Sequence, residues 1–397
     1  MTKRYNYRAY PTPEQEELLA RTFGSTRFVY NKYVEQNLAQ KKLIGYAEAC
    51  RNLVNLKKEY EWLSEVSSIA LQQTLKDAAS GIKNYFRSPK TVHPPRYKKR
   101  TNEQSFNIVG ANSFKVIKVN AKWAEITLPK MKPLKIRTER ALPSTPTSVR
   151  IIHHPSGKYF VSFVVQVESK PLPKIDKHLA VDLGLTDLAI TVNNEGETNK
   201  VPNPRYYLKG EAKLAKLQQA HAKTLKGSNN REKARVRVAR QHEKVANQRK
   251  DFVRKLVFNL VSENQTVITE TLSITNMVKN HKLSKSIMDA SWGMFLTLLT
   301  QKCEETGRTH YQLGRFFPSS KTCSNCGTVK ETLGLSERSW TCAHCYVTHD
   351  RDINAAMVLL IVGLKELNIN LAAGWAESIN ATQGLPLGGT TLLTNLV

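Results

Sequence analysis

The chain is organised around Cys323-Ser-Asn-Cys326 and Cys342-Ala-His-Cys345, which are followed directly by His349-Asp350-Arg351-Asp352. Fifteen residues separate the two cysteine pairs, so four thiolates can meet tetrahedrally around one zinc ion at Zn–S distances of about 2.3 Å. Four protein ligands leave no position open for water or substrate. The pattern therefore predicts one structural zinc ion, clamped beside a helix that carries acidic residues.

The chain is strongly basic. Among 397 residues, 60 are Lys or Arg and 33 are Asp or Glu, which gives a formal charge of +27. Such an excess is typical of surfaces that bind phosphates, and the alternative is a ribosomal-type protein or a basic protein that binds nonspecifically. The longest apolar run, residues 355–364, is too short to cross a bilayer, and residues 1–12 lack the apolar core of a signal peptide. We therefore expect a cytoplasmic protein that binds nucleic acid and no membrane.

Hydrophobic periodicity predicts a multidomain α+β fold. Residues 1–13 and 101–170 alternate like strands and are expected to form a β-barrel, and the apolar spacing of residues 14–100 predicts an inserted helical domain. An α/β nuclease domain is expected from 171–316 and 346–375, with a zinc-binding domain inserted at 317–345. Residues 376–397 are expected to be a disordered tail.

Two segments concentrate positive charge. Residues 87–100 hold six basic residues, three prolines and no acid, which predicts an extended loop that is either a solvated linker or a nucleic-acid contact. Residues 205–250 hold fourteen basic and three acidic residues on a helical pattern broken near Gly227, which predicts a helical hairpin. The candidate phosphate contacts are Arg96, Lys98, Lys99 and Arg100 in the loop, and Arg235, Arg237 and Arg240 in the hairpin.

Three acids stand in an apolar or helical context. Asp182 lies in the middle of an expected strand at 179–184, Glu270 follows a β-branched run, and Asp352 opens an expected helix at 351–367. A carboxylate in an apolar strand needs a metal, a cationic partner or a raised pKa. Each acid alone has a local explanation, as a salt-bridged core acid, a surface group at a strand end or a helix cap.

Local explanations do not account for the three acids together, because more than 80 residues separate each from the next. A ribonuclease H-like sheet does, since two strands and one helix then deliver the carboxylates to one point. Three acids there can hold two Mg²⁺ ions about 3.5–4 Å apart for phosphodiester hydrolysis. Asp187 and Asp350 are expected to be a turn acid and a helix cap.

The order of four motifs resembles the transposon-encoded TnpB family, the compact relatives of type V CRISPR effectors. These motifs are Val181-Asp-Leu-Gly184, Val267-Ile-Thr-Glu270-Thr-Leu272, Phe317-Pro-Ser-Ser-Lys-Thr-Cys-Ser-Asn-Cys-Gly327 and His349-Asp-Arg-Asp-Ile-Asn-Ala-Ala356. The resemblance implies an insertion-sequence-encoded, RNA-guided DNA endonuclease that cuts next to a short flanking motif. It implies one RuvC-type site at Asp182, Glu270 and Asp352, and zinc at the four cysteines.

The resemblance also implies partners. They are a guide RNA derived from the transposon end, double-stranded target DNA and its displaced single strand, bound by a monomer in the cytoplasm of a bacterium or archaeon, at the nucleoid. By position, Arg338 would be a cation near the cleft, and Tyr46 and Gln72 would help to read the flanking motif. Gln72 could contact adenine in a bidentate way, although an ordinary helix surface explains each of these two residues equally well.

Three other functions use some of the same features. A strand-transfer transposase needs the same three carboxylates but does not explain a four-cysteine insertion directly before the third acid. An RNA-guided repressor without nuclease activity does not explain why all three acids are present. A zinc-ribbon regulator leaves Asp182 unexplained.

Overall fold

The computed structural model describes residues 1–40, 43–101, 103–315, 317–334 and 336–370. The backbone divides into two compact units, here called the N-terminal and C-terminal units. The N-terminal unit comprises Met1–Glu168 and Lys223–Arg240, and the C-terminal unit comprises Ser169–Ala222 and the chain from Gln241 onward. The tail expected at 376–397 lies outside the described residues.

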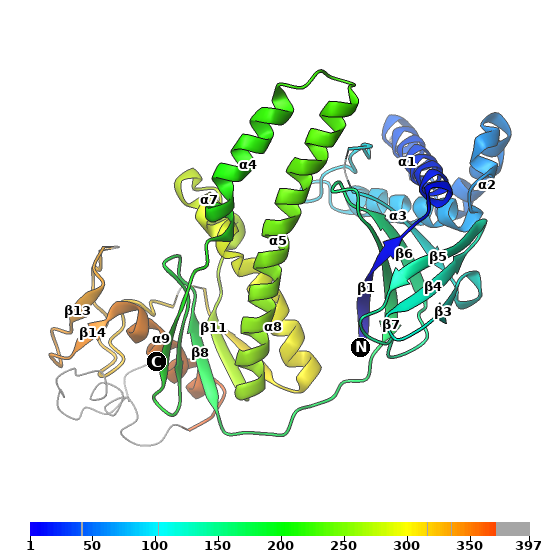
Figure 1. Cartoon of the computed structure of the whole chain (residues 1–397). Coiled ribbons are helices and arrows are strands. Elements are labelled where there is room, and N and C mark those ends of the chain that lie inside the picture. The colour runs from blue at the N-terminus through cyan, green and yellow to red at the C-terminus, as the bar shows by residue number, and fades with distance from the viewer. Residues whose placement is uncertain (41–42, 102, 316, 335, 371–397) are drawn as a thin grey trace. The chain divides into compact units, whose positions relative to one another are not determined.

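A seven-stranded antiparallel sheet forms the framework of the N-terminal unit, in the order β2-β6-β7-β1-β5-β4-β3 (Figure 1). Side chains alternate between core and solvent, as in Ala124, Ile126 and Leu128 of β4. In the described part of the chain, the edge strands β2 and β3 are not paired with each other, so closure into the expected barrel stays a prediction. The strands are β1 Thr2–Tyr10, β2 Gln104–Val109, β3 Lys115–Lys118, β4 Trp123–Leu128, β5 Met131–Arg137, β6 Ser148–His153 and β7 Tyr159–Gln166.

Three helices lie between β1 and β2 in the chain, in the range expected to be helical. They are α1 Pro13–Gln40, α2 Tyr46–Glu59 and α3 Ser68–Arg87, and two short 3₁₀ turns occur at Glu61–Ser64 and Ala111–Ser113. Leu19 and Phe23 of α1 and Ala70 of α3 share the core of the sheet with Phe106. The helices therefore cover the sheet and also form a second core among themselves.

The basic segment after α3 has no helix or strand, as expected, but it is attached to α1. The Asn31 side-chain amide donates to the Lys98 backbone carbonyl over 3.1 Å, and the Lys98 backbone N–H donates to the Asn31 side-chain oxygen over 2.8 Å. The Lys98 ammonium lies over the Tyr30 ring, 4.1 Å from its centre. The loop is thus held against the helix along part of its length.

A mixed five-stranded sheet forms the framework of the C-terminal unit, in the order β10-β9-β8-β11-β12. β8 His178–Asp182, β11 Thr266–Glu270 and β12 Thr309–Leu313 are mutually parallel neighbours. β9 Asp187–Asn193 and β10 Thr198–Pro202 continue the sheet in antiparallel pairing. The hairpin expected at 179–192 is confirmed, but β8 ends at Asp182, so this acid lies at the strand end and not in its middle.

Helices cover both faces of this sheet (Figure 1). α9 Arg351–Glu366 packs on Ala180, Ile190 and Ile268, while α5 Asn229–Glu263 and α8 Trp292–Thr306 pack on the alternate side chains, including Leu179 and Val267. α9 lies so close to the sheet that a Cβ on Gly363 would come within 2.7 Å of Ile268. The remaining elements are α4 Tyr206–Ala222, α6 Ile274–Met277, α7 His281–Ala290, β13 Ser339–Thr341 and β14 Thr348–Asp350.

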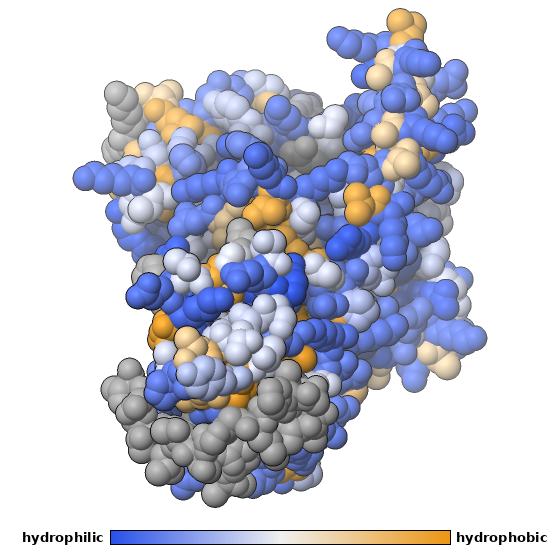
Figure 2. All heavy atoms as spheres, turned by 90° about the vertical axis from the view of Figure 1, so that its left-hand side faces the viewer, coloured by the Kyte–Doolittle hydropathy of each residue, from blue (hydrophilic) through white to orange (hydrophobic). Residues whose placement is uncertain are grey.

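The helical hairpin expected at 205–250 is present as α4 and α5, whose division lies at residues 223–228. No described helix has the length and apolar character needed to span a membrane. Hydrophilic side chains predominate on the face shown in Figure 2, as the charge of +27 leads one to expect.

Candidate active site

The four cysteines converge as their spacing predicts. Their sulfur atoms all lie within 4.8 Å of one another, and both Cys323–Cys345 and Cys326–Cys342 are 3.6 Å apart. Tetrahedral Zn–S bonds of about 2.3 Å place sulfur atoms about 3.8 Å apart, so the cluster fits one zinc ion. Burial opposes ionisation of Cys326, but hydrogen bonding with Thr328 lowers its pKa to about 6, which favours the thiolate that zinc binds.

Two buried side chains connect this cluster to α9. The Asn354 amide donates to the Thr322 carbonyl over 2.8 Å and accepts from the Ser324 N–H over 3.0 Å, which clamps the backbone on both sides of Cys323. His349 Nε2 lies 3.1 Å from the Cys323 sulfur, and burial lowers the pKa of His349 to about 4. The first turn of α9, which carries Asp352, is therefore fastened to the first cysteine pair.

The three acids singled out in the sequence also converge. β8 and β11 are parallel with Val181 opposite Thr269, so Asp182 and Glu270 lie side by side where the two strands end. Their carboxyl groups share a hydrogen bond, and the Asp352 carboxylate is near enough to act on the Asp182 charge. Asp352 is the second residue of α9 and its side chain is 22% exposed. Two strand ends and one helix end thus form a single cluster.

Burial raises the pKa of both strand acids, and crowding of negative charge adds to the shift at Asp182. Burial, with repulsion from Glu270 and Asp352, raises the pKa of Asp182 well above its ordinary value. Burial also raises the pKa of Glu270, while its hydrogen bond with Asp182 acts in the opposite direction. A proton held between these carboxyl groups is what a metal ion would displace.

Cations border the cluster. Arg338 donates to Asp352 over 3.2 Å, and Arg351 Nε lies 3.7 Å from the same carboxylate. Asp350 points elsewhere, since it accepts hydrogen bonds from the N–H groups of Asp352 and Ile353 and pairs with Lys200 at 2.7 Å. Its expected role as helix cap is confirmed.

The donor set suits hard cations. Mg²⁺ prefers oxygen ligands and usually keeps several waters, and this cluster offers carboxylate oxygens at a partly open edge. Asp182, Glu270 and Asp352 would be the residues that hold it. Asp187 is expected from the sequence to be a turn acid, and the structure places it as the first residue of β9.

The candidate nucleic-acid contacts differ in their exposure and in how far other protein groups already bind their side chains. Arg235 binds both carboxylate oxygens of Glu232 and donates to the Pro155 carbonyl over 3.2 Å, and Arg240 donates to the Ser156 carbonyl over 3.3 Å. Arg237 is exposed and has no ion pair among the described residues. Arg96, Lys99 and Arg100 are exposed on the loop, whereas the Lys98 side chain packs over Tyr30. Tyr46, at 41% exposure, opens α2, and Gln72 is exposed on α3.

Sequence reasoning missed the residues that connect the two centres. Asn354 is a polar residue inside an otherwise apolar helical run, and the buried His349 alternates with the half-buried Thr348 and Asp350 in β14. Only those two patterns could have pointed to them. Lys200 gave no signal, because a lysine on an edge strand is ordinary.

Family comparisons match three parts of the chain. Residues 162–281 match a family described as "Probable transposase", and residues 292–359 match "Cas12f1-like, TNB domain". Residues 1–42 match a "Helix-turn-helix domain", although the described part of this range forms strand β1 and one continuous helix, α1.

Solved structures share the fold. The Cas12f1–sgRNA–target DNA complex aligns over 88% of this chain and 83% of its own, with a TM-score of 0.56 and 12% identity. The mini-RNA-guided endonuclease CRISPR-Cas phi3 aligns over 94% and 93%, with a TM-score of 0.54 and 10% identity. The chain thus has the fold class of the compact Cas12 effectors.

Sequence relatives define the family more narrowly. A Streptomyces pristinaespiralis protein, proposed by its name to be an RNA-guided DNA endonuclease, is 38% identical over 91% of this chain and 89% of its own length. An Escherichia coli protein with the same proposed activity is 27% identical over 90% and 92%. A TnpB-like protein of Acanthamoeba polyphaga mimivirus is 24% identical over 90% and 72%. The chain belongs to the TnpB family.

Proposed function

We propose that this protein is an RNA-guided DNA endonuclease encoded by an insertion sequence, which cuts target DNA next to a short flanking motif. The observation that carries the proposal is the convergence of Asp182, Glu270 and Asp352 from two strand ends and one helix end. The names of its relatives and the fold shared with Cas12 effectors support the same activity.

The nuclease site is proposed to be of the RuvC type, on a ribonuclease H-like sheet. Asp182 and Glu270 would hold metal at the strand ends, and Asp352 would complete the site from α9. When bound, two Mg²⁺ ions supply a polarised water and charge stabilisation for the leaving oxygen. In the hydrolysis, the water oxygen forms a bond to phosphorus while one phosphorus–oxygen bond to a sugar breaks, and the departing oxygen takes up a proton.

The domain boundaries follow the same proposal. Residues 171–316 and 346–375 would form the nuclease domain, with the zinc-binding segment 317–345 inserted directly before the third acid. Residues 1–13 and 101–170 would form a barrel-like domain with the helical segment 14–100 inserted. The four cysteines support one zinc ion, whose role would be to fix α9 rather than to react.

Arg338 is proposed to act on the scissile phosphate. Its guanidinium already contacts the Asp352 carboxylate and is 59% exposed, so it can turn toward an incoming phosphate. A cation there would stabilise charge that develops in the transition state.

Nucleic-acid partners are proposed to be a guide RNA from the transposon end, double-stranded target DNA and its displaced strand. Arg237 and the loop residues Arg96, Lys99 and Arg100 are the exposed cations best suited to phosphates. Tyr46 and Gln72 are proposed readers of the flanking motif.

Strand transfer is the second candidate, because the matched family description is "Probable transposase". The two activities are separated by one experiment. The RNA that copurifies with the protein is sequenced, and a matched duplex with randomised flanks is offered with Mg²⁺. We expect RNA-dependent cutting next to one flanking motif. Joining of labelled duplexes in RNA-free protein would instead support the transposase, and tight binding without cutting would support a repressor.

A further inference from the structure

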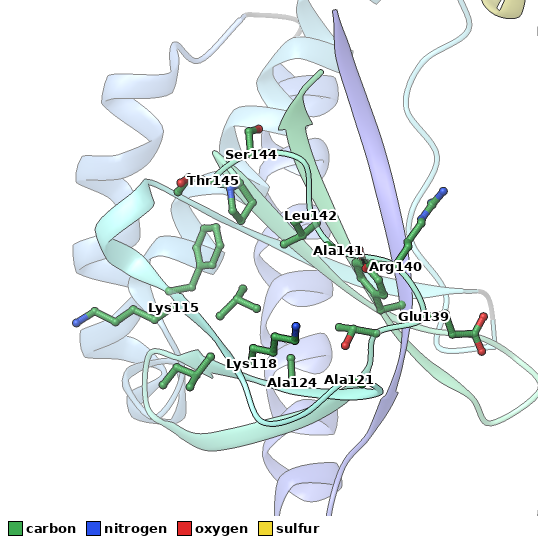
Figure 3. Close-up of a pocket in the computed structure, with 16 residues that line it drawn as sticks. Lys115, Lys118, Ala121, Ala124, Glu139, Arg140, Ala141, Leu142, Ser144 and Thr145 are labelled. Carbon is green, nitrogen blue, oxygen red and sulfur yellow. Dashed lines mark hydrogen bonds between the residues drawn. The ribbon is translucent and has the colours of Figure 1, made fainter. Parts of the chain in front are cut away.

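The N-terminal unit contains a cavity of about 600 Å³ that the proposed nuclease site does not use. It lies between β3, β4 and the loop Thr138–Pro146, at an end of the sheet core that side chains leave unfilled (Figure 3). Its size falls within the range of small-molecule sites, about 300–1,000 Å³. The core of the N-terminal unit is therefore incompletely filled beside the edge strand β3.

Apolar side chains line the cavity. Phe114 and Tyr7 belong to the core of the sheet, with Val116 and Leu142 packed against it. Small residues keep the space open, namely Ala121, Ala124 and Ala141. Ile117, which lines the cavity, and Val119, which does not, are both more than half exposed, so apolar surface extends from the cavity to the solvent.

The covering loop is held in place. The Tyr7 hydroxyl donates to the Arg140 carbonyl over 2.9 Å, and the Arg140 guanidinium lies 4.0 Å from the centre of the Tyr5 ring. Ser144 donates to the Gln166 carbonyl over 2.8 Å and accepts from its N–H over 3.1 Å. These contacts preform the cavity instead of leaving it to be built by a ligand.

The charge at the mouth is one-sided. Lys118 points into the cavity, whereas Lys115, Glu139 and Arg140 point away from it (Figure 3). Within the described residues, the Lys118 ammonium has no acidic partner, and Glu139 is engaged by Arg137 at 3.4 Å. The cavity therefore suits a guest with an apolar part and an anionic group at the entrance.

We propose that this cavity takes one unpaired nucleotide of the bound RNA, with its base against Phe114 and its phosphate at Lys118. Bases bind proteins by stacking and apolar contact while their phosphates meet cations. Folded RNA offers bases in loops and bulges that are already unstacked, whereas a DNA duplex would first have to extrude one. The inference rests on the proposed function, which supplies the RNA.

The test uses the full chain with its copurified RNA and no target DNA. Irradiation at short ultraviolet wavelength, followed by mass spectrometry, maps the peptides that carry a nucleotide. We expect a crosslink within residues 114–124 of the native protein. Ala121→Trp, which fills the cavity, should remove that crosslink, while Val119→Trp, which adds the same ring on the exposed part of the hairpin, should keep it.

A comparison of two charge-reversal variants provides the second measurement. Lys118→Glu should weaken RNA binding about tenfold more than Lys122→Glu, because Lys122 lies on the same hairpin but does not line the cavity. Equal RNA affinities of the Lys118→Glu and Lys122→Glu variants, or a crosslink that persists in Ala121→Trp, would overturn the proposal. A crosslink that appears only in a parallel sample with added target DNA would assign the cavity to DNA and also overturn the proposal. A protein that binds no RNA at all would instead count against the proposed function.

Discussion

The guanidinium of Arg338 donates a hydrogen bond to the carboxylate of Asp352 over 3.2 Å. Arg338 directly precedes β13 in the four-cysteine segment, and Asp352 is the second residue of α9. The Arg351 N–H donates to the Arg338 carbonyl over 2.9 Å, so the backbone holds the two residues together as well. The cysteine segment and the acid cluster therefore meet at this contact.

Removing the Arg338 charge tests its proposed role at the phosphate. We expect Arg338→Ala to lower the cleavage rate about 10²–10³-fold, as loss of one transition-state contact does elsewhere, with little change in RNA binding. Lys330→Ala, which removes a half-buried cation paired with Glu337 in the same segment, is the matched control. Equal cleavage by both variants would place Arg338 outside the chemistry.

Zinc content tests the four-cysteine centre. We expect one zinc ion per chain in the native protein, measured by elemental analysis, and loss of that ion in Cys342→Ser. Cys50→Ser removes a half-buried cysteine outside the cluster and should keep the zinc. Native protein without stoichiometric zinc would contradict the assignment.

Asn354 tests the connection between the zinc centre and α9. Asn354→Ala leaves the Thr322 carbonyl and the Ser324 N–H buried without their partner, at a cost of about 1–3 kcal/mol each. We expect faster hydrogen exchange in the first turn of α9 and faster zinc loss to a chelator. Asn259→Ala, an exposed helical asparagine in the same unit, should change neither rate.

The sequence anticipates most of this architecture, because hydrophobic period and cysteine spacing are local signals. The strands β8, β9 and β11, the helix α9 and the Asp350 cap could be predicted in this way, whereas β10 and β12 were not. The coupling through Asn354 and His349 could not, since it depends on side chains that meet only after the segment folds back. The same limit applies to Arg235. Its sequence position predicts a phosphate contact, but in the folded chain its guanidinium is bound to Glu232 and to the Pro155 carbonyl.

The pH dependence of the melting temperature tests the carboxyl cluster. The pKa of Asp182 is higher in the folded protein than in the unfolded chain, so its contribution to stability is complete below the ordinary carboxyl pKa and is lost as pH rises through the raised value. In a chelator, we expect the melting temperature to fall as pH rises across that window. Mg²⁺ should restore it at the high end, because binding favours the folded state. Asp182→Asn should flatten both effects.

Salt dependence tests the helical hairpin. We expect Arg237→Ala to reduce the slope of log affinity for RNA against log salt by about 1, as loss of one phosphate contact does. Arg235→Ala should change the slope less, because its guanidinium is already bound to Glu232 and the Pro155 carbonyl. The reverse order would mean that this ion pair opens when RNA binds.

The most direct test of the central claim measures binding and cutting on the same preparations of Asp352→Asn and Asp350→Asn. Asp352→Asn keeps the shape of the side chain but removes charge that the metal needs, so RNA and target DNA should bind while cleavage falls by orders of magnitude. Asp350→Asn should retain most of its activity, because it alters a cap worth about 1 kcal/mol. Full cutting by Asp352→Asn, with Asp350→Asn inactive, would contradict the assignment of the three acids.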